Sequence, residues 1–280
     1  MLMSTQASRY AHKLLKARAA GTLLDPLTST AKVSVDDAYD IAKSILDIRI
    51  AQGETPVGRK IGFSNRKMWN RYGMGSPITE PIWSPLFDSS VEFAMDNCAL
   101  HSLKKAQQPR IEPELVFKLS RTPEPDITVE ALAECLEWMA HGFEIVTSPY
   151  PDWQFEAADA IAAFGLHRAL IVGEPRLLSA ATRRNLAQVL GSATLSLSRT
   201  SNGTPSLVAA GFGKDVMDSP LHALWQLHQQ LQRQPAFQGL QAGEIITTGS
   251  WTDAHSVERG EVWSSAFLQI GLPGLNVSFS

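Results

Sequence analysis

The stretch RIEPELVFKL, residues 110–119, places two glutamates, Glu112 and Glu114, inside a run that is otherwise mostly apolar. Side chains two residues apart in a strand point to the same side, so both carboxylates are expected on one face together with Val116. One interpretation is an edge strand, indicated by Pro113, whose glutamates face water. The apolar run that follows favours buried carboxylates instead, which repel each other and need a raised pKa or a cation between them.

A hard divalent ion such as Mg²⁺ or Mn²⁺ would resolve this conflict, because such ions take carboxylate oxygens together with water and substrate oxygens. A third acid in an apolar setting, Glu144, lies between Phe143 and Ile145 on a predicted strand. Alternatively, Glu144 is an interior glutamate whose charge is satisfied by an arginine such as Arg110. The residues alone leave both interpretations of Glu144 open.

The rest of the chain supplies short apolar runs and a few helical segments around this strand. Apolar spacing predicts helices at about 9–20, 35–50, 129–141 and 219–232, and strands at 58–63, 111–119, 143–147, 168–173, 193–198, 244–248 and 275–279. Because strands and helices do not alternate regularly, we expect an α+β fold around a mixed, rolled β-sheet. We expect two parts, a helical N-terminal region at 1–55 and a catalytic domain at 56–280.

Composition excludes several classes of partner. The 25 basic and 28 acidic residues nearly cancel and form no dense basic stripe, which argues against nucleic acid. The apolar stretches fall short of the roughly 20 residues that span a bilayer, and the N-terminal residues do not resemble a signal peptide, so we expect no membrane partner and a cytoplasmic location. Cys98 and Cys135 form no CxxC or Cys/His cluster, which argues against a thiolate metal site.

Five segments, in order, carry a resemblance to a known family: VGRKIGF (57–63), QPRIEPELVFKL (108–119), FEIVTSPYPDWQFEAADAIA (143–162), GFGKDVMDSPLHALWQLHQQL (211–231) and LQAGEIITTGSWTDAHSVERGEVW (240–263). They resemble the 2-oxopent-4-enoate (2-hydroxypentadienoate) hydratase and 4-oxalocrotonate decarboxylase family, within the fumarylacetoacetate hydrolase-like superfamily. The resemblance implies a sheet of the fumarylacetoacetase C-terminal type and a homo-oligomer.

The resemblance also assigns roles to individual residues. It implies that Glu112, Glu114 and Glu144 bind Mg²⁺ or Mn²⁺ and that Lys60 is a catalytic residue beside the substrate. Without the resemblance, Lys60 would be interpreted as an exposed lysine on a strand. A partly desolvated lysine near a cation loses basicity, which would suit proton transfer. The expected substrate contacts are made by Leu86, Phe164, Leu166 and Thr248, although the turn after Thr248 could simply reverse the chain.

The implied substrate is a small 2-oxo acid or its dienol. A hydratase of this type adds water to a 2-hydroxy-2,4-dienoate to give a 4-hydroxy-2-oxo acid, and the lyase of the 2-keto-4-pentenoate hydratase type is the favoured function. A decarboxylase of the 4-oxalocrotonate type, an acylpyruvate hydrolase and a non-catalytic binding protein are the alternatives. The relatives act in the breakdown of aromatic compounds.

Two segments depart from the family pattern. Ile82-Trp83-Ser84 stands where hydratases usually carry an acidic residue, leaving Glu80 and Asp88 as the nearest carboxylates, and the segment from Ala163 to Leu166 replaces expected polar residues with apolar ones. We therefore expect either a larger, more apolar substrate or another reaction on the same metal site. A hydrolase needs a histidine paired with a glutamate; His141 has the spacing to Glu144, and His167 is a further candidate.

Overall fold

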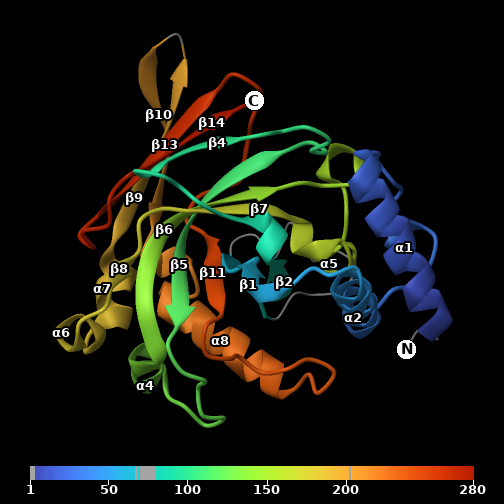
Figure 1. Ribbon diagram of the computed structural model, residues 1–280, viewed down its shortest axis with the longest axis horizontal. Helices are drawn as coiled ribbons and strands as arrows, with labels where there is room; N and C mark the ends of the chain where they lie inside the picture. Colours follow the sequence, from blue (N-terminus) through green and yellow to red (C-terminus); the bar gives the residue numbers. More distant parts are fainter. Residues whose placement is uncertain (1–3, 67–68, 70–79, 202) are drawn as a thin grey trace.

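The computed structural model describes residues 4–66, 69, 80–201 and 203–280 (Figure 1). Its α-helices are α1 (Ser4–Ala20), α2 (Val35–Ala51), α4 (Val129–Leu132), α5 (Ala157–Ala162), α6 (Ala180–Arg183), α7 (Leu186–Ser192) and α8 (Pro220–Gln232). Its strands are β1 (Pro56–Gly62), β2 (Ile82–Phe87), β3 (Val91–Phe93), β4 (Cys98–His101), β5 (Arg110–Leu119), β6 (Leu136–Val146), β7 (His167–Val172), β8 (Arg176–Leu177), β9 (Thr194–Ser201), β10 (Thr204–Phe212), β11 (Ile245–Ser250), β12 (His255–Ser256), β13 (Val262–Leu268) and β14 (Leu275–Phe279). Short 3₁₀ helices lie at Leu27–Ser29, Asp88–Ser90, Ala133–Cys135, Pro151–Trp153, Phe164–Leu166 and Gly213–Asp215.

The strands form two mixed sheets. The larger has the order β2-β1-β11-β5-β6-β7-β3, with β12 paired to β5 and β8 paired to β6, and the smaller has the order β10-β9-β13-β14-β4. Most neighbours are antiparallel, but β1 and β11, β3 and β7, and β14 and β4 are parallel. The predicted α+β fold with a mixed, curled sheet is therefore confirmed.

Strand β5 lies in the interior of the larger sheet, between β11 and β6, so the edge-strand interpretation of this segment is wrong. Pro113 is tolerated because the ladder to β11 is interrupted beside it, between Thr247 and Ser250. The backbone N–H of Trp251 donates to the Pro113 carbonyl at 3.1 Å across this irregularity. The glutamates of β5 are consequently held by strands on both sides.

The helix predicted at 129–141 is wrong in its second half. Helix α4 ends at Leu132, a 3₁₀ turn follows, and β6 begins at Leu136. Strand β6 is buried along almost its whole length because apolar clusters cover both of its faces, so its sequence lacks the alternation that marks a half-exposed strand. Tertiary pairing outweighs the local helical preference of this segment.

The other predicted helices are confirmed within a few residues, and their caps explain where they begin. At the start of α2, Ser34 Oγ accepts from the Asp37 N–H and the Asp37 carboxylate accepts from the Ser34 N–H, both at 3.1 Å. At α8, Ser219 caps the helix and Pro220 occupies its first position. Helices α1, α2 and α5 lie together on one side of the molecule, opposite the β9–β10 hairpin (Figure 1).

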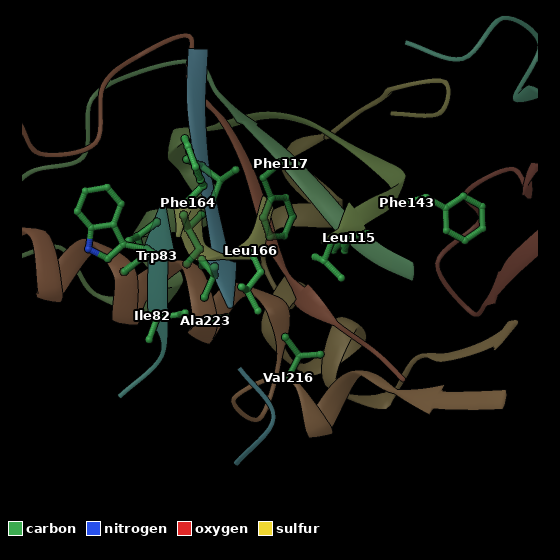
Figure 2. Packing of buried hydrophobic residues seen from close by; sticks show 14 of the residues in the cluster. Ile82, Trp83, Leu115, Phe117, Phe143, Phe164, Leu166, Val216 and Ala223 are labelled. Atoms are coloured by element: carbon green, nitrogen blue, oxygen red, sulfur yellow. The ribbon is translucent and has the colours of Figure 1, made fainter. Parts of the chain in front are cut away.

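Apolar residues cover both faces of the larger sheet. Leu115 and Phe117 of β5 belong to the main core, which also includes Trp83, Phe143 and residues of α8 (Figure 2). The alternate side chain, Val116, belongs to a smaller cluster with Leu86, Trp138, Ala140, Leu170, Val172 and Ile245. The glutamates share the Val116 face and therefore lie at the end of this smaller cluster. Within the described residues, none of the helices has the length and apolar character needed to cross a bilayer.

Candidate metal and active site

Antiparallel pairing of β5 and β6 brings the predicted acidic residues together. Glu112 lies directly opposite Glu144, and Glu114 lies opposite Gly142. One carboxylate oxygen from each of Glu112, Glu114 and Glu144 lies within 4.8 Å of the others. Glu114 and Glu144 are fully buried and Glu112 is partly buried. The three side chains that the sequence singled out therefore form one acidic cluster, although their role as metal ligands remains a prediction.

Burial and mutual repulsion disturb the ionisation of this cluster. Burial, opposed by Lys60 and reinforced by Glu144, raises the pKa of Glu112 to about 7. Burial and the charges of Glu144 and Glu112 raise the pKa of Glu114 well above its usual range. A cation among the three would relieve this repulsion, and an all-oxygen donor set suits Mg²⁺ or Mn²⁺.

Glu114 is held in place through one of its two oxygens. Its Oε2 accepts a short hydrogen bond from Thr247 Oγ1 and a 2.8 Å bond from the Gly249 N–H. Its Oε1 is buried and has no hydrogen-bond partner among the described residues. An unpaired buried carboxylate oxygen is costly unless a ligand completes it, so the cluster fits a bound cation.

The irregular end of β11 that supplies these donors depends on Gly249. Its φ of +101° is in the left-handed region that favours glycine, and an added Cβ would lie 1.9 Å from Ser64 Oγ. The predicted contact residue Thr248 is fully buried, and its hydroxyl donates to the Leu115 carbonyl at 2.9 Å, away from the acidic cluster. The neighbouring Thr247, which the sequence analysis did not identify, is the β11 threonine that contacts the cluster.

Glu144 has a partner on each oxygen. Lys60 Nζ lies 3.1 Å from Oε2, and His167 Nδ1 lies 2.8 Å from Oε1. The predicted alternative partner, Arg110, does not pair with Glu144. Burial opposes ionisation of Glu144, but Lys60 and His167 outweigh it and lower its pKa. Glu144 is thus the member of the cluster that the protein itself keeps charged.

Lys60 is buried beside the cluster, so the exposed-lysine interpretation is wrong. Burial acts to lower its pKa, but the charges of Glu144, Glu112 and Glu114 outweigh burial and raise it. The predicted loss of basicity is therefore not found for the protein chain by itself. Its side chain has room because two neighbours are glycines: a Cβ at Gly62 would lie 3.4 Å from Nζ, and one at Gly165 would lie 3.1 Å from Cε.

A cavity opens onto this cluster. Its lining includes the charged side chains of Lys60, Glu112, Glu114 and Arg110 and the apolar side chains of Ile82, Val146, Trp153, Phe155 and Leu166. Of the four predicted substrate contacts, only Leu166 lies on this wall. Leu86 is fully buried in the smaller apolar cluster, and Phe164 points toward Arg18 and α2.

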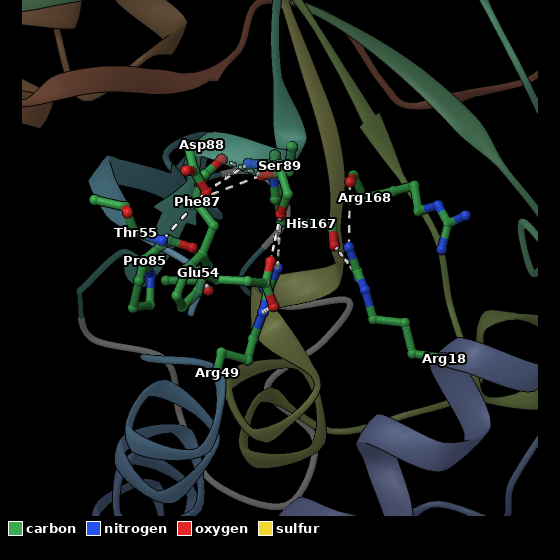
Figure 3. Close-up of polar contacts among 12 residues, drawn as sticks. Arg18, Arg49, Glu54, Thr55, Pro85, Phe87, Asp88, Ser89, His167 and Arg168 are labelled. Atoms are coloured by element: carbon green, nitrogen blue, oxygen red, sulfur yellow. Dashed lines mark hydrogen bonds and ion pairs between the residues drawn. The ribbon is translucent and has the colours of Figure 1, made fainter. Parts of the chain in front are cut away.

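The segment of the wall that departs from the family pattern has an unusual backbone. Phe164, Gly165 and Leu166 have φ values of 62°, 58° and 65°. Arg18 of α1 stabilises the end of this segment by donating hydrogen bonds to the backbone carbonyls of His167 at 2.5 Å and Arg168 at 3.2 Å (Figure 3). The Arg18 guanidinium also stacks over the Phe164 ring. The N-terminal helix thereby holds the cavity wall in place. No signal in the sequence pointed to Arg18.

The remaining predicted acids lie away from the cavity lining. Glu80 pairs with Arg233, and Asp88 accepts from the backbone N–H of Thr55 at 3.2 Å. Ile82 does line the cavity, in keeping with the apolar character expected for this departure.

The two histidines differ in position. His141 lies on the opposite face of β6 from Glu144, where its Nε2 is 2.5 Å from Ser265 Oγ and its ring packs on Phe267. It therefore does not pair with Glu144 as its spacing suggested. His167 does pair with Glu144, but its Nε2 lies 3.0 Å from Ser90 Oγ, and burial lowers its pKa to about 4. Both ring nitrogens of His167 are occupied within the protein.

Comparison with known proteins shows the family to which this chain belongs. No family model matches the chain. A 2-hydroxyhexa-2,4-dienoate hydratase from Comamonas testosteroni is 30% identical over 253 residues, which cover 89% of this chain and 87% of the relative. The chain belongs to the 2-oxopent-4-enoate hydratase and 4-oxalocrotonate decarboxylase family. Another member, a 4-oxalocrotonate decarboxylase from a Pseudomonas species, is 29% identical over 255 residues, covering 90% of this chain and 91% of the relative.

A solved structure shares the fold of this family member along its full length. The 4-oxalocrotonate decarboxylase from Pseudomonas putida G7, complexed with magnesium and adipate, superposes with a TM-score of 0.86 at 21% identity, covering 100% of this chain and 99% of that one. The predicted recognition of the family is confirmed, and the fold extends over both the N-terminal helices and the sheets.

Proposed function

We propose that this protein is a divalent-metal-dependent lyase that adds water to a 2-hydroxy-2,4-dienoate, giving a 4-hydroxy-2-oxo acid. The observation that carries the proposal is the convergence of Glu112, Glu114 and Glu144 at the end of a cavity. One buried oxygen of Glu114 has no hydrogen-bond partner in the part of the chain that the structure describes. The hydratase from Comamonas testosteroni, 30% identical over most of the chain, supports the reaction class.

The three glutamates would hold Mg²⁺ or Mn²⁺, which supplies a Lewis acid for negative charge on the substrate's C2 oxygen. The C1 carboxylate and C2 oxygen of the substrate are placed at this acidic end, within reach of Lys60. The Lys60 ammonium, whose positive charge the cluster stabilises, can donate a hydrogen bond or a proton there. Protonation of the dienol at C5, with loss of the proton from its C2 hydroxyl, gives the 2-oxo-3-enoate. Water then adds with its hydroxyl on C4 and a proton on C3.

The apolar wall has its own part in this proposal. Val146, Phe155 and Leu166 surround the carbon chain beyond C2 and limit the water that reaches it. The apolar residues at the two departures from the family pattern support a substrate with more carbon at this end than 2-hydroxypenta-2,4-dienoate.

Decarboxylation is the second candidate, because a 4-oxalocrotonate decarboxylase is 29% identical to the chain and the same acidic cluster could serve that reaction. Hydrolysis of acylpyruvates is less well supported. The His–Glu pair that it requires is present as His167 and Glu144, but no nitrogen of His167 remains free to activate water.

An ultraviolet assay tests the proposal. Enzymatically generated 2-hydroxypenta-2,4-dienoate and a longer substituted analogue are each given to the protein with Mg²⁺ or Mn²⁺, and again with a chelator. We expect metal-dependent loss of dienol absorbance above the uncatalysed rate, formation of the hydroxylated product and no CO₂. CO₂ released from a dicarboxylate analogue would favour decarboxylation, whereas pyruvate and an acid formed from an acylpyruvate would favour hydrolysis.

We further propose that residues 1–55 and 56–280 act as a helical region and a catalytic domain, respectively, and that the protein works as a homo-oligomer in the cytoplasm. The start of β1 at Pro56 supports the division, although α1 and α2 contribute to the same apolar core as the sheets. Analytical ultracentrifugation of the full chain tests the oligomeric state.

A further inference from the structure

Asp253 is an acid of the cavity lining that lies outside the acidic cluster. It follows β11 in a segment that is held against β5 at both ends, at Ser250 by the pairing of β11 and at His255 by the pairing of β12. Because β5 lies between β11 and β6, Asp253 lines the cavity from the side opposite Val146 of β6.

Hydrogen bonds within this segment fix the backbone at Asp253. The Thr252 N–H donates to Ser250 Oγ at 3.3 Å, and that hydroxyl donates to the Thr252 carbonyl at 2.7 Å. The Thr252 hydroxyl donates in turn to the Asp253 carbonyl at 2.9 Å. These bonds use backbone and hydroxyl groups only, so none of them occupies the Asp253 carboxylate.

The carboxylate of Asp253 has no partner in the described part of the chain. No cationic group there lies within 4.0 Å of it, no hydrogen bond reaches it, and its side chain is exposed. Its charge still acts on the interior, because burial raises the pKa of Glu112 and the charges of Glu144 and Asp253 add to that rise. Asp253 therefore combines access to water with a position beside the acidic cluster.

The proposed reaction needs a group that takes a proton from the water added at C4. The ionisable side chains that line the cavity, among the described residues, are those of Lys60, Arg110, Glu112, Glu114 and Asp253. An arginine stays protonated in proteins, and Lys60 donates its hydrogen bond to Glu144. The carboxylates of Glu112 and Glu114 hold the cation in the proposed function. Asp253 is the proton acceptor that remains.

We propose that Asp253 is the general base of the hydration step, with the added water held between its carboxylate and C4 of the substrate. This inference rests on the proposed function, since it uses the placement of the C1 carboxylate and C2 oxygen at the acidic cluster.

The step balances in atoms and electrons. As the water oxygen bonds to C4, one of its O–H bonds breaks and the proton passes to Asp253. The electron pair of the C3–C4 double bond moves to C2–C3, and that of the C2 carbonyl moves onto its oxygen. The Asp253 carboxyl then returns the proton to C3 as the C2 carbonyl forms again, so one water molecule has been added.

Two half-reactions separate this role from a general loss of activity. Ketonisation of 2-hydroxypenta-2,4-dienoate by the Mg²⁺-loaded protein in D₂O is followed by NMR spectroscopy as deuterium entering C5 above the uncatalysed rate. Hydration is measured by itself, starting from 2-oxopent-3-enoate and following the formation of 4-hydroxy-2-oxopentanoate.

Asp253→Asn should hydrate 2-oxopent-3-enoate about 100- to 10,000-fold more slowly than the wild type, the range usual for loss of a general base. Its rate of ketonisation and its unfolding temperature should match those of the wild type, because the acidic cluster is unchanged and the lost carboxylate had no partner. Asp253→Ala, which also lacks a proton acceptor, should behave in the same way.

Asp126→Asn is the matched control. Asp126 is also exposed, but it lies in the loop before α4 and does not line the cavity. Both half-reactions should proceed at wild-type rates in this variant.

Unchanged hydration in either Asp253 variant would overturn the inference and leave the proposed function intact. Equal loss of ketonisation and hydration would overturn it as well, because Asp253 would then act on substrate binding or on the first step. A wild-type protein that neither ketonises the dienol nor hydrates the 2-oxo-3-enoate would refute the proposed function, and the Asp253 assignment with it.

Discussion

Glu112 and Glu144 lie directly opposite each other on neighbouring antiparallel strands, with Lys60 hydrogen-bonded to Glu144. Like charges in this arrangement destabilise a sheet, and a third carboxylate, Glu114, lies in the same cluster. Lys60 alone cannot balance three carboxylates, so the charged forms of Glu112 and Glu114 are disfavoured when no cation is bound. The sheet therefore carries at its centre an electrostatic cost that a bound divalent cation would offset.

The first prediction concerns Glu114→Gln. In the presence of a chelator, this variant should unfold at the same temperature as the wild type or higher, because one of the repelling charges is gone. Added Mg²⁺ should raise the unfolding temperature of the wild type and not of the variant, and calorimetric titration should show at least about a 100-fold weaker affinity for the ion. Glu134→Gln, at an exposed position, is the control and should respond to Mg²⁺ like the wild type.

A second prediction separates Thr247 and Thr248, two neighbouring threonines of β11. Thr247→Val removes a hydroxyl that donates to Glu114. Because contacts of this kind position a metal ligand, the variant should bind Mg²⁺ about 10- to 100-fold more weakly. Thr248→Val removes a hydroxyl that donates to the Leu115 carbonyl, so it should lower the stability of the protein without weakening Mg²⁺ binding. Calorimetric titration of both variants with Mg²⁺ tests this prediction. Similar Mg²⁺ affinities in the two variants would show that the Thr247 contact does not position Glu114.

The acidic cluster was predictable because its signal is local. Two glutamates spaced for one face of an apolar strand, followed by a third acid in another apolar strand, indicated buried charge in need of a cation. This local pattern does not predict the pairing register of β5 and β6, which places Glu112 opposite Glu144. Register depends on long-range packing, which a single sequence does not display.

Other elements were missed for physical reasons. The sequence pattern predicts a helix that overlaps the first part of β6, because burial on both faces of this strand removes the alternating pattern of a half-exposed strand. Arg18 acts on a segment about 150 positions away in the chain, and Thr247 differs from Thr248 only in the side of the strand that it faces. These contacts follow from the tertiary fold, so no short motif could indicate them.

A third prediction addresses the space around Lys60. Gly165→Ala places a Cβ 2.9 Å from the Ser84 Cβ and 3.1 Å from Lys60 Cε, in addition to the strain of a left-handed backbone. Gly53→Ala carries a comparable backbone strain, at a φ of +92°, but has no atoms within 4 Å of the new Cβ. Both should lose about 1 kcal/mol of stability from the backbone. Only Gly165→Ala should also lose lyase activity, because Lys60 must shift.

Thermal unfolding and the dienol assay on the two alanine variants check this expectation. Equal activity in Gly165→Ala and Gly53→Ala would show that the placement of Lys60 tolerates a displaced neighbour or that Lys60 does not take part in the reaction.

The last prediction is a pH dependence that originates in the core. Burial lowers the pKa of His141 from 6.5 to about 4, so the folded protein keeps this ring neutral. Between these values the unfolded chain binds the proton and the folded chain does not, so stability falls as the pH falls from about 6.5 toward 4. At pH 5 the loss from His141 alone should be about 2 kcal/mol relative to pH 8. Above pH 7 this residue should contribute no pH dependence.

Comparison with His141→Gln isolates this contribution from the other titrating groups. The variant is less stable at pH 8, because it disturbs the contacts with Ser265 and Pro273. The difference in free energy of unfolding between the two proteins should narrow by about 2 kcal/mol on going to pH 5, measured by urea denaturation with a chelator present. Parallel stability curves for the two proteins would mean that His141 titrates alike in the folded and unfolded chains and is not kept neutral by burial.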